Sequence, residues 1–145
     1  MQTKKEYATE LFNPGLNCAQ AVLAPFCEEY GLDLETALKM TTGLGGGCNL
    51  GELCSAVTGA AIVIGLKYGR CTAENLVAKT NCDMKVAQFV EVFKALHGHV
   101  VCRDLLGYDL TTEEGKARKQ ATDRATSPCN TFVCSAVEIL EKLGY

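Results

Sequence analysis

The sequence lacks the features that mark several classes of protein. It has no linker, no low-complexity tract, no internal repeat and almost no strand signals. Lys and Arg are scattered rather than gathered into the basic stripe of a nucleic-acid surface, and the net charge is only −3. The most apolar run, Leu53–Leu66, is shorter than the roughly 20 residues that cross a bilayer. We therefore expect no nucleic-acid partner and no membrane partner, and we predict a buried core helix at this run.

The cysteines lack the spacing of the common cysteine frameworks. The N-terminus reads Met-Gln-Thr-Lys-Lys-Glu-Tyr, without the apolar stretch of a secretory signal, so we expect a cytoplasmic protein with reduced thiols. Nine cysteines are many for such a protein, yet the number is odd and no Cys-x-x-Cys pair exists. These facts argue against a disulfide framework, a zinc ribbon and a thioredoxin-type motif. The remaining possibilities are that the cysteines are metal ligands from separate segments, reactive thiols from separate segments, or small apolar residues of the core.

What is present is helical patterning with clear cap signals. Caps or capping boxes are predicted at five helix starts: Thr3 with Glu6, Asn17 with Gln20, Asp33, Asn49 with Glu52, and Ser127 with Pro128. Nearly half the residues are apolar, and the length suits one hydrophobic core. We predict an all-α fold, a single domain over residues 1–145, built as a compact bundle of about five to seven helices. The polar stretch 111–126 is expected to be surface helix or loop.

The centre of this bundle is predicted to be an apolar helix at about residues 50–69, starting near Asn49. It carries small residues, among them Gly59 and Gly65, against which other backbones can pack closely. A second helix is predicted from Asn17 to Gly31, and a long one from about 72 to 96.

Four cysteines recur at predicted helix starts. Cys18 follows the cap Asn17, Cys129 lies two residues after the cap Ser127, Cys102 opens a short helix, and Cys54 lies in the second turn of the central helix. A helix start presents unpaired N–H groups and about half a positive charge, which favours thiolate over thiol. We therefore expect these four thiols to have lowered pKa values and to converge in the folded bundle.

At this point the sequence resembles a known family. The segments that carry the resemblance are Asn17-Cys18-Ala19-Gln20-Ala21-Val22, Gly45-Gly46-Gly47, Gly51-Glu52-Leu53-Cys54-Ser55-Ala56-Val57-Thr58-Gly59-Ala60, Leu66-Lys67-Tyr68-Gly69, Cys102-Arg103-Asp104-Leu105-Leu106-Gly107 and Cys129 with its helix. They are similar to the C_GCAxxG_C_C family of redox-active proteins over essentially the whole chain. The resemblance implies that Cys18, Cys54, Cys102 and Cys129 are the functional cysteines. Ser55 departs from the glycine that the family has after the central cysteine.

The glycine-rich segment Gly45–Gly51 has two interpretations. Glycines let backbone N–H groups converge, so the segment could pass close to Cys54 and donate hydrogen bonds to sulfur. It could also be an irregular connection between two helices. It lacks the Gly-Lys-Ser/Thr ending of a phosphate loop. The candidate cofactor-binding residues here are Gly46, Gly47, Cys48, Gly51 and Ser55, with Cys48 as a fifth thiol at the site.

Three functions follow from the four cysteines. The first is a metal centre or iron–sulfur cluster ligated by Cys18, Cys54, Cys102 and Cys129, used for electron transfer or sensing. The second needs no metal and is thiol–disulfide chemistry, with Cys54 as nucleophile and another of the four as resolving thiol. The third is a structural or binding bundle without redox chemistry. For a redox protein we expect a redox partner protein, and whether the chain forms a homodimer is left open.

The remaining candidates receive ordinary structural roles. Cys27 and Cys82 lie on apolar helix faces and are expected in the core, while Cys134 should face away from Cys129 and Cys71 should be exposed. His97 and His99 precede Cys102 at ligand-like spacing, but a helix C-terminus favours surface imidazoles there.

Overall fold

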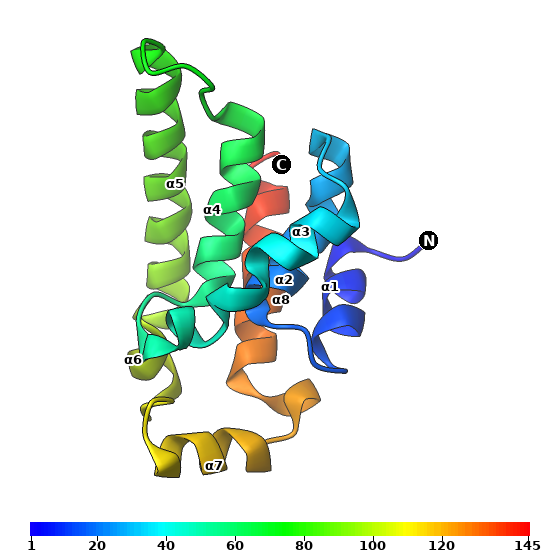
Figure 1. Ribbon diagram of the computed structural model, residues 1–145, viewed down its shortest axis with the longest axis vertical. Coiled ribbons are helices and arrows are strands. Elements are labelled where there is room, and N and C mark those ends of the chain that lie inside the picture. The colour runs from blue at the N-terminus through cyan, green and yellow to red at the C-terminus, as the bar shows by residue number, and fades with distance from the viewer.

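The computed structural model describes all 145 residues and contains eight α-helices and no β-strand (Figure 1). The helices are α1 (Lys4–Phe12), α2 (Cys18–Cys27), α3 (Leu34–Thr41), α4 (Ser55–Tyr68), α5 (Leu76–His97), α6 (Cys102–Leu106), α7 (Glu113–Ala121) and α8 (Pro128–Lys142). The all-α prediction is confirmed. One helix more than the expected five to seven is present, because the polar stretch near 113–121 forms a helix of its own.

The predicted caps fix the starts of four helices. Thr3 and Glu6 complete a capping box on α1, and Asn17 and Gln20 complete one on α2. Asp33 caps α3, and Ser127 caps α8 with proline directly after it. Each oxygen accepts a backbone N–H that the first helical turn leaves without a partner. These confirmed caps place Cys18 as the first residue of α2 and Cys129 as the second residue of α8.

The predicted start of the central helix near Asn49 is wrong. α4 begins at Ser55, and the preceding segment Gly47–Gly51 (η3) is a π-helical turn in which Cys48 and Asn49 have left-handed φ angles of 57° and 61°. A Cβ on Gly47 would lie 2.5 Å from the backbone nitrogen of Glu52, so the turn closes only with glycine there. Such a backbone cannot continue into a right-handed helix, so α4 starts later and Cys54 becomes its N-cap residue.

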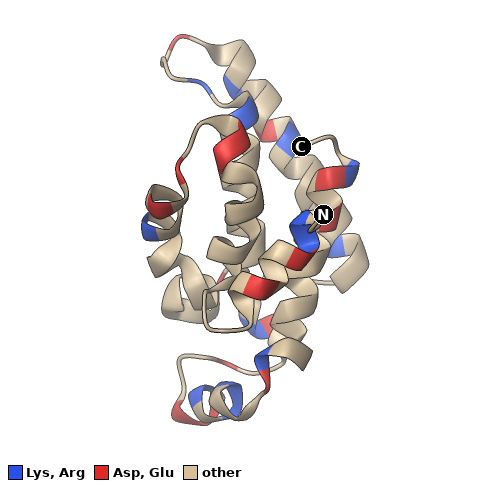
Figure 2. Cartoon of the chain, turned by 90° about the vertical axis from the view of Figure 1, so that its right-hand side faces the viewer, with Lys and Arg blue, Asp and Glu red and all other residues tan.

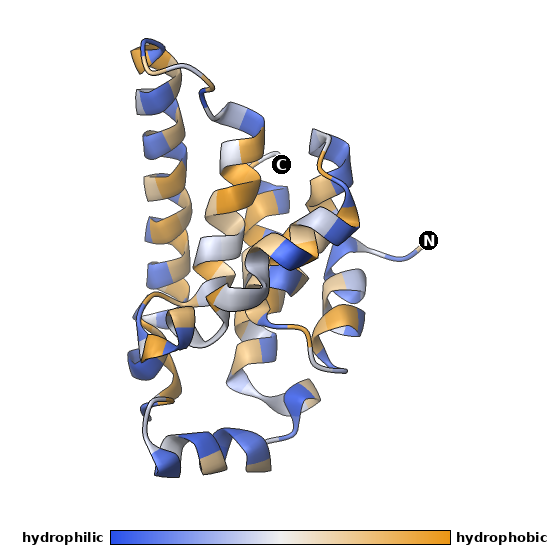
Figure 3. Cartoon of the chain, in the orientation of Figure 1, coloured by the Kyte–Doolittle hydropathy of each residue, from blue (hydrophilic) through white to orange (hydrophobic).

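The core is formed by α2, α4, α8 and part of α5. A cluster of 22 buried apolar residues includes Val22, Phe26, Val57, Ile64 and Phe93. Figure 3 shows the apolar colouring concentrated on α4 and on the helix faces turned toward it, whereas α7 is hydrophilic. α5 is an unbroken helix that buries only Phe89 and Phe93 completely, so it covers the bundle from one side.

α2 and α4 approach each other closely at Gly59. A Cβ on that residue would lie 2.9 Å from the carbonyl oxygen of Ala19 and 3.0 Å from its Cα. α2 and α4 therefore pack backbone to backbone near their first turns, as the small residues of the central helix predicted. This contact determines the spacing between the start of α2 and the start of α4.

Charged side chains lie mainly on the outside of the bundle. Figure 2 shows Lys, Arg, Asp and Glu along α7 and near helix ends, while most of the central ribbon is uncharged. None of the helices combines the length and the apolar character that a bilayer crossing requires.

Candidate thiol site

The four helix-start cysteines line one cavity. Its volume is about 850 Å³, and its wall includes Cys18, Cys54, Cys102 and Cys129. They come from the starts of α2, α4, α6 and α8, four elements that are far apart in the sequence. Cys54 and Cys102 are buried, and Cys18 and Cys129 are half-buried.

A short backbone bridge holds the Cys54 and Cys102 segments together. Leu53 and Val101 form one antiparallel β-bridge. Around it, the Cys54 N–H donates to the Val100 carbonyl at 2.8 Å, and the Cys102 N–H donates to the Glu52 carbonyl at 2.5 Å. Sequence analysis missed this pairing, since a single bridge has no alternating apolar pattern.

A side chain strengthens the same junction. The Arg103 Nη1 donates to the Gly51 carbonyl at 3.2 Å and forms an ion pair with Glu52 at 2.7 Å. Both charged groups are partly exposed, so the ion pair adds little stability by itself. The ion pair instead holds η3 against the first turn of α6 and so helps to fix the position of Cys102.

The start of α2 is held by a polar network. The Asn17 Oδ1 accepts from the Gln20 N–H at 2.9 Å, while its Nδ2 donates to the carbonyls of Thr41 and Thr42 at 3.0 Å each. Gly45 packs directly against Asn17, since a Cβ there would lie 2.8 Å from the Asn17 Cβ. The glycine-rich segment therefore wraps around the residue that precedes Cys18.

The start of α8 carries the fourth thiol. Arg124 lies just before this helix, where its Nε donates to the Phe12 carbonyl at 2.9 Å and its Nη2 to the Leu16 carbonyl at 2.5 Å. Its guanidinium also stacks over the Phe12 ring at 4.2 Å from the centroid. These contacts fix a positive charge in the cavity wall near Cys129.

Burial, rather than helix position, determines the pKa values of Cys54 and Cys102. Burial raises the pKa of Cys54 to about 12 and that of Cys102 to about 11. The N–H groups of Ala56 and Val57 favour the Cys54 thiolate, yet no capping hydrogen bond to that sulfur is complete. The expectation that all four helix starts lower the cysteine pKa is therefore wrong. The free energy needed to remove a thiolate from water exceeds the stabilisation that the nearby N–H groups give it.

Cys129 is the exception. Hydrogen bonding from the Cys18 thiol, assisted by the positive charges of Lys119 and Arg124, lowers the pKa of Cys129 to about 7 against the opposing effect of burial. The same hydrogen bond, with burial, raises the pKa of Cys18 well above its ordinary value. The two sulfurs thus act as one pair, in which Cys129 loses its proton first and Cys18 keeps its own and donates to the thiolate.

Ser55 takes part in this arrangement. It is buried, it lines the cavity, and its hydroxyl lowers the pKa of Cys18 by hydrogen bonding to the sulfur. The residue that departs from the family glycine therefore offers the Cys18 sulfur an additional donor.

The candidate residues of the glycine-rich segment divide into two groups. Gly46 lines the cavity together with Gly45, but no hydrogen bond from this segment to a cysteine sulfur is present. Gly47, Cys48 and Gly51 do not line it, and Cys48 is exposed. The segment thus borders the thiols, and Asn49 and Leu50 of its left-handed turn also line the cavity.

The other cysteines and the histidines lie outside the cavity wall. Cys27 is buried, Cys82 packs against the core and Cys71 is exposed, as predicted. Cys134 contacts the Thr9 hydroxyl at 3.4 Å. The His97 ring is half-buried between Phe93 and Phe132, which differs from the surface imidazole expected there, and its Nε2 is 2.9 Å from the Ser135 hydroxyl.

Sequence reasoning missed the cations of the site. Lys116, Lys119 and Arg124 line the cavity, as does Tyr108. They come from α7 and its flanks, a stretch whose polar composition indicated only surface structure. No local signal could have placed them, since their role depends on where α7 crosses the end of the bundle.

The residues present do not form a metal-binding group. No three Cys, His, Asp or Glu side chains are arranged to hold a metal ion. We therefore derive no chemistry through a metal from this geometry.

The chain belongs to the C_GCAxxG_C_C family, which is described as "Putative redox-active protein (C_GCAxxG_C_C)" and matches residues 16–143. The recognition made from the sequence is thus confirmed. No curated protein and no solved structure gives a significant match.

Proposed function

We propose that this protein is a thiol–disulfide redox protein whose reactive pair is Cys129 and Cys18. The observation that supports the proposal is that Cys18 and Cys129 line one cavity, where Cys18 lowers the pKa of Cys129 to about 7 and Cys129 raises the pKa of Cys18. A nucleophile with a pKa near ambient pH is favoured in thiol exchange, because it combines a high thiolate fraction with adequate nucleophilicity.

The reaction balances with these two residues and one substrate disulfide. The Cys129 thiolate attacks one substrate sulfur, so a mixed disulfide forms and the other substrate sulfur departs as a thiolate. The Cys18 sulfur then attacks the Cys129 sulfur, and the Cys18 proton neutralises a departing thiolate. A Cys18–Cys129 disulfide forms and the second substrate thiol leaves, so the protein has lost two electrons and the substrate has gained two.

The pair is restored by the reverse exchange with a reducing thiol. In a cytoplasmic setting, which the sequence predicts, a dithiol redox partner would supply the two electrons. The two sulfurs need only approach to about 2.05 Å to form the bond.

Cys54 and Cys102 have a supporting role in this proposal. Cys54 was the nucleophile predicted from the sequence, but its pKa of about 12 leaves almost no thiolate at neutral pH. Two protonated, buried thiols beside the pair add no negative charge to the cavity wall. The pKa values therefore favour Cys129 over Cys54 for the attacking role.

A metal or iron–sulfur centre is the second candidate function. It is favoured by one observation, that all four family cysteines line a single cavity. Against it stands the arrangement of the side chains, since no three Cys, His, Asp or Glu residues are positioned to hold a metal ion. Anaerobic purification followed by metal analysis and an absorption spectrum decides between the two candidates: bound iron or zinc at one equivalent per chain would overturn the proposal.

Disulfide mapping tests the proposal directly. The reduced protein is exposed to 2-hydroxyethyl disulfide, quenched with acid and alkylating reagent, and analysed by mass spectrometry. We expect a Cys18–Cys129 disulfide in the wild type, a stable mixed disulfide on Cys129 in Cys18→Ser, and an unmodified Cys18 in Cys129→Ser, whereas the exposed Cys48 and Cys71 react alike in all variants. Cys134→Ser, on the same helix but outside the cavity, is the control and should behave as the wild type. A disulfide between other cysteines, or unchanged oxidation in Cys129→Ser, refutes it.

A further inference from the structure

The wall of the thiol cavity carries charge of one sign. It contains three cationic side chains, Lys116, Lys119 and Arg124, and no Asp or Glu. The chain as a whole has a net charge of −3, so this distribution is opposite to that of the rest of the protein. A cavity lined by one sign of charge concentrates ligands of the opposite sign.

Two of these cations lack a carboxylate partner. Arg124 bonds only to backbone carbonyls, and neither Arg124 nor Lys119 takes part in an ion pair. Lys116 is 3.8 Å from Glu113, but both groups are well exposed and such a pair is weak. Most of the positive charge in the wall therefore remains available to a ligand.

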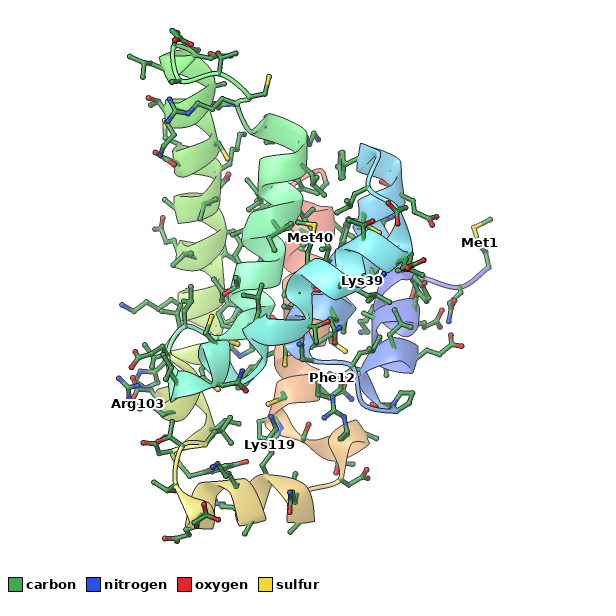
Figure 4. All side chains as sticks on the ribbon, in the orientation of Figure 1. Met1, Phe12, Lys39, Met40, Arg103 and Lys119 are labelled. Carbon is green, nitrogen blue, oxygen red and sulfur yellow. The ribbon has the colours of Figure 1, made fainter.

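The cations are positioned around the reactive pair rather than spread over the surface. α7 crosses the end of the bundle, and Figure 1 shows it below the start of α8. In Figure 4, Lys119 extends from α7 toward the bundle. Lys119 and Arg124 both lower the pKa of Cys129, so their charges reach that sulfur. A ligand whose anionic groups meet these cations would bring its remaining atoms close to Cys129.

The dimensions and the other wall groups suit a small molecule. A cavity of about 850 Å³ lies within the roughly 300–1,000 Å³ range of small-ligand sites. Asn17, Gln20, Tyr108, Thr122 and Ser127 add neutral polar groups to its wall. Leu105, Leu106, Leu110 and Phe132 supply apolar surface for a short aliphatic chain.

We infer that the substrate of this site is a small disulfide that bears anionic groups, with Lys119, Arg124 and Lys116 binding those groups while the Cys129 thiolate attacks the S–S bond. This inference rests on the proposed thiol–disulfide function and names its substrate class. The electron balance is that of the exchange above: Cys18 and Cys129 are oxidised, and the bound disulfide is reduced to two anionic thiols.

A series of three disulfides of similar size tests the substrate class. The reduced protein is reacted at pH 7 and low ionic strength with 3,3′-dithiodipropionate (anionic), 2-hydroxyethyl disulfide (neutral) and cystamine (cationic). Each rate is divided by the rate of the same compound with the urea-unfolded protein, which removes intrinsic reactivity. We expect a normalised preference of at least about tenfold for the dianion over the neutral compound, disfavour of the cation, and loss of the preference in 0.5 M salt.

Variants connect the preference to the cavity. Lys119→Gln and Lys116→Gln should each weaken the preference for the dianion by roughly three- to fivefold. Lys142→Gln removes the same charge from the exposed far end of α8, outside the cavity, and should leave it unchanged. Lys119→Arg should restore most of the preference.

Binding without redox chemistry separates this inference from the proposed function. Octanedioate has the chain length of 3,3′-dithiodipropionate but no sulfur, so its affinity, measured by calorimetry, reports recognition alone. Saturable binding that weakens in Lys119→Gln and Lys116→Gln supports the inference even if the thiols prove unreactive, in which case the proposed function alone fails. Reactive thiols with equal normalised rates for all three disulfides, or octanedioate binding unaffected by these variants, overturn the inference and leave the proposed function standing.

Discussion

Alkylation at neutral pH should distinguish Cys129 sharply from Cys54. With a pKa of about 7, Cys129 is roughly half thiolate at pH 7, whereas Cys54, with a pKa of about 12, is thiolate in about one part in 10⁵. A more basic thiolate is intrinsically more nucleophilic, by about two orders of magnitude over five pKa units at a Brønsted slope of 0.4–0.5. The net expectation is that Cys129 reacts roughly several hundredfold faster.

The assay is a pulse of iodoacetamide on the reduced protein between pH 5 and pH 10, with each cysteine peptide quantified by mass spectrometry. Iodoacetamide is neutral, so the cavity cations do not bias the comparison. The modification rate of Cys129 should rise between pH 6 and pH 8 and then level off, while that of Cys54 is several hundredfold lower at pH 7 and rises about tenfold per pH unit up to pH 10. Exposed Cys71 is the internal reference for an accessible thiol.

Two controls isolate the cause. In urea the cysteine rates should become similar, since the environments that separate the pKa values are gone. In Cys18→Ala the rate profile of Cys129 should shift to higher pH, because the largest stabilising contribution to its thiolate is the hydrogen bond from the Cys18 thiol, which alanine cannot replace. A Cys129 rate that keeps rising above pH 9 in the wild type, or a Cys54 rate that exceeds it at pH 7, would refute the pairing argument.

Three further predictions concern stability, measured by urea unfolding of the reduced protein. Gly59→Ala should destabilise the protein by about 1–2 kcal/mol, because the added Cβ would meet backbone atoms of α2. Gly65→Ala in the same helix adds a Cβ that meets no other atom, so it should stabilise the protein by up to about 1 kcal/mol. The raised pKa of Cys54 means that its contribution to stability is complete below the ordinary value of 9.0 and is lost as pH rises toward 12. Cys18 and Cys102 add losses of the same sign, so the free energy of unfolding in Cys54→Ala should fall less steeply above pH 9 than in the wild type, by about 1.4 kcal/mol per pH unit. Asn17→Ala should cost about 2 kcal/mol and Asp33→Ala about 1 kcal/mol, since Asn17 also bonds two carbonyls of the next segment.

Local chemistry allowed much of the fold to be predicted. The cap residues Thr3, Asn17, Asp33 and Ser127 act where the sequence placed them, because a cap depends only on a side chain and the N–H groups within three residues of it. The start of the central helix could not be predicted in this way. Glu52 looked like part of a capping box, but the left-handed turn before it and the bridge between Leu53 and Val101 prevent a helix from starting there.

The candidate site likewise has features that the sequence predicts and features that it does not. The identities of the four cysteines were accessible from motif and helix position, and the structure places all four on one cavity. Their pKa values were not accessible, because burial and the neighbours of each sulfur depend on elements distant in the chain. The pKa of Cys129 is lower than that of Cys54 because Cys18, Lys119 and Arg124 stabilise the Cys129 thiolate. The spacing of the cysteines in the sequence does not indicate that these three residues lie near Cys129.

The sequence by itself determined the helical class, the capped starts of α1, α2, α3 and α8, and the placement of Cys18, Cys102 and Cys129 at or next to helix starts, since these depend on interactions within a few residues. Only the tertiary structure decided which thiol loses its proton and which charges surround it. Those properties arise from desolvation and from Coulomb interactions through space, and both depend on how helices from opposite ends of the chain pack together.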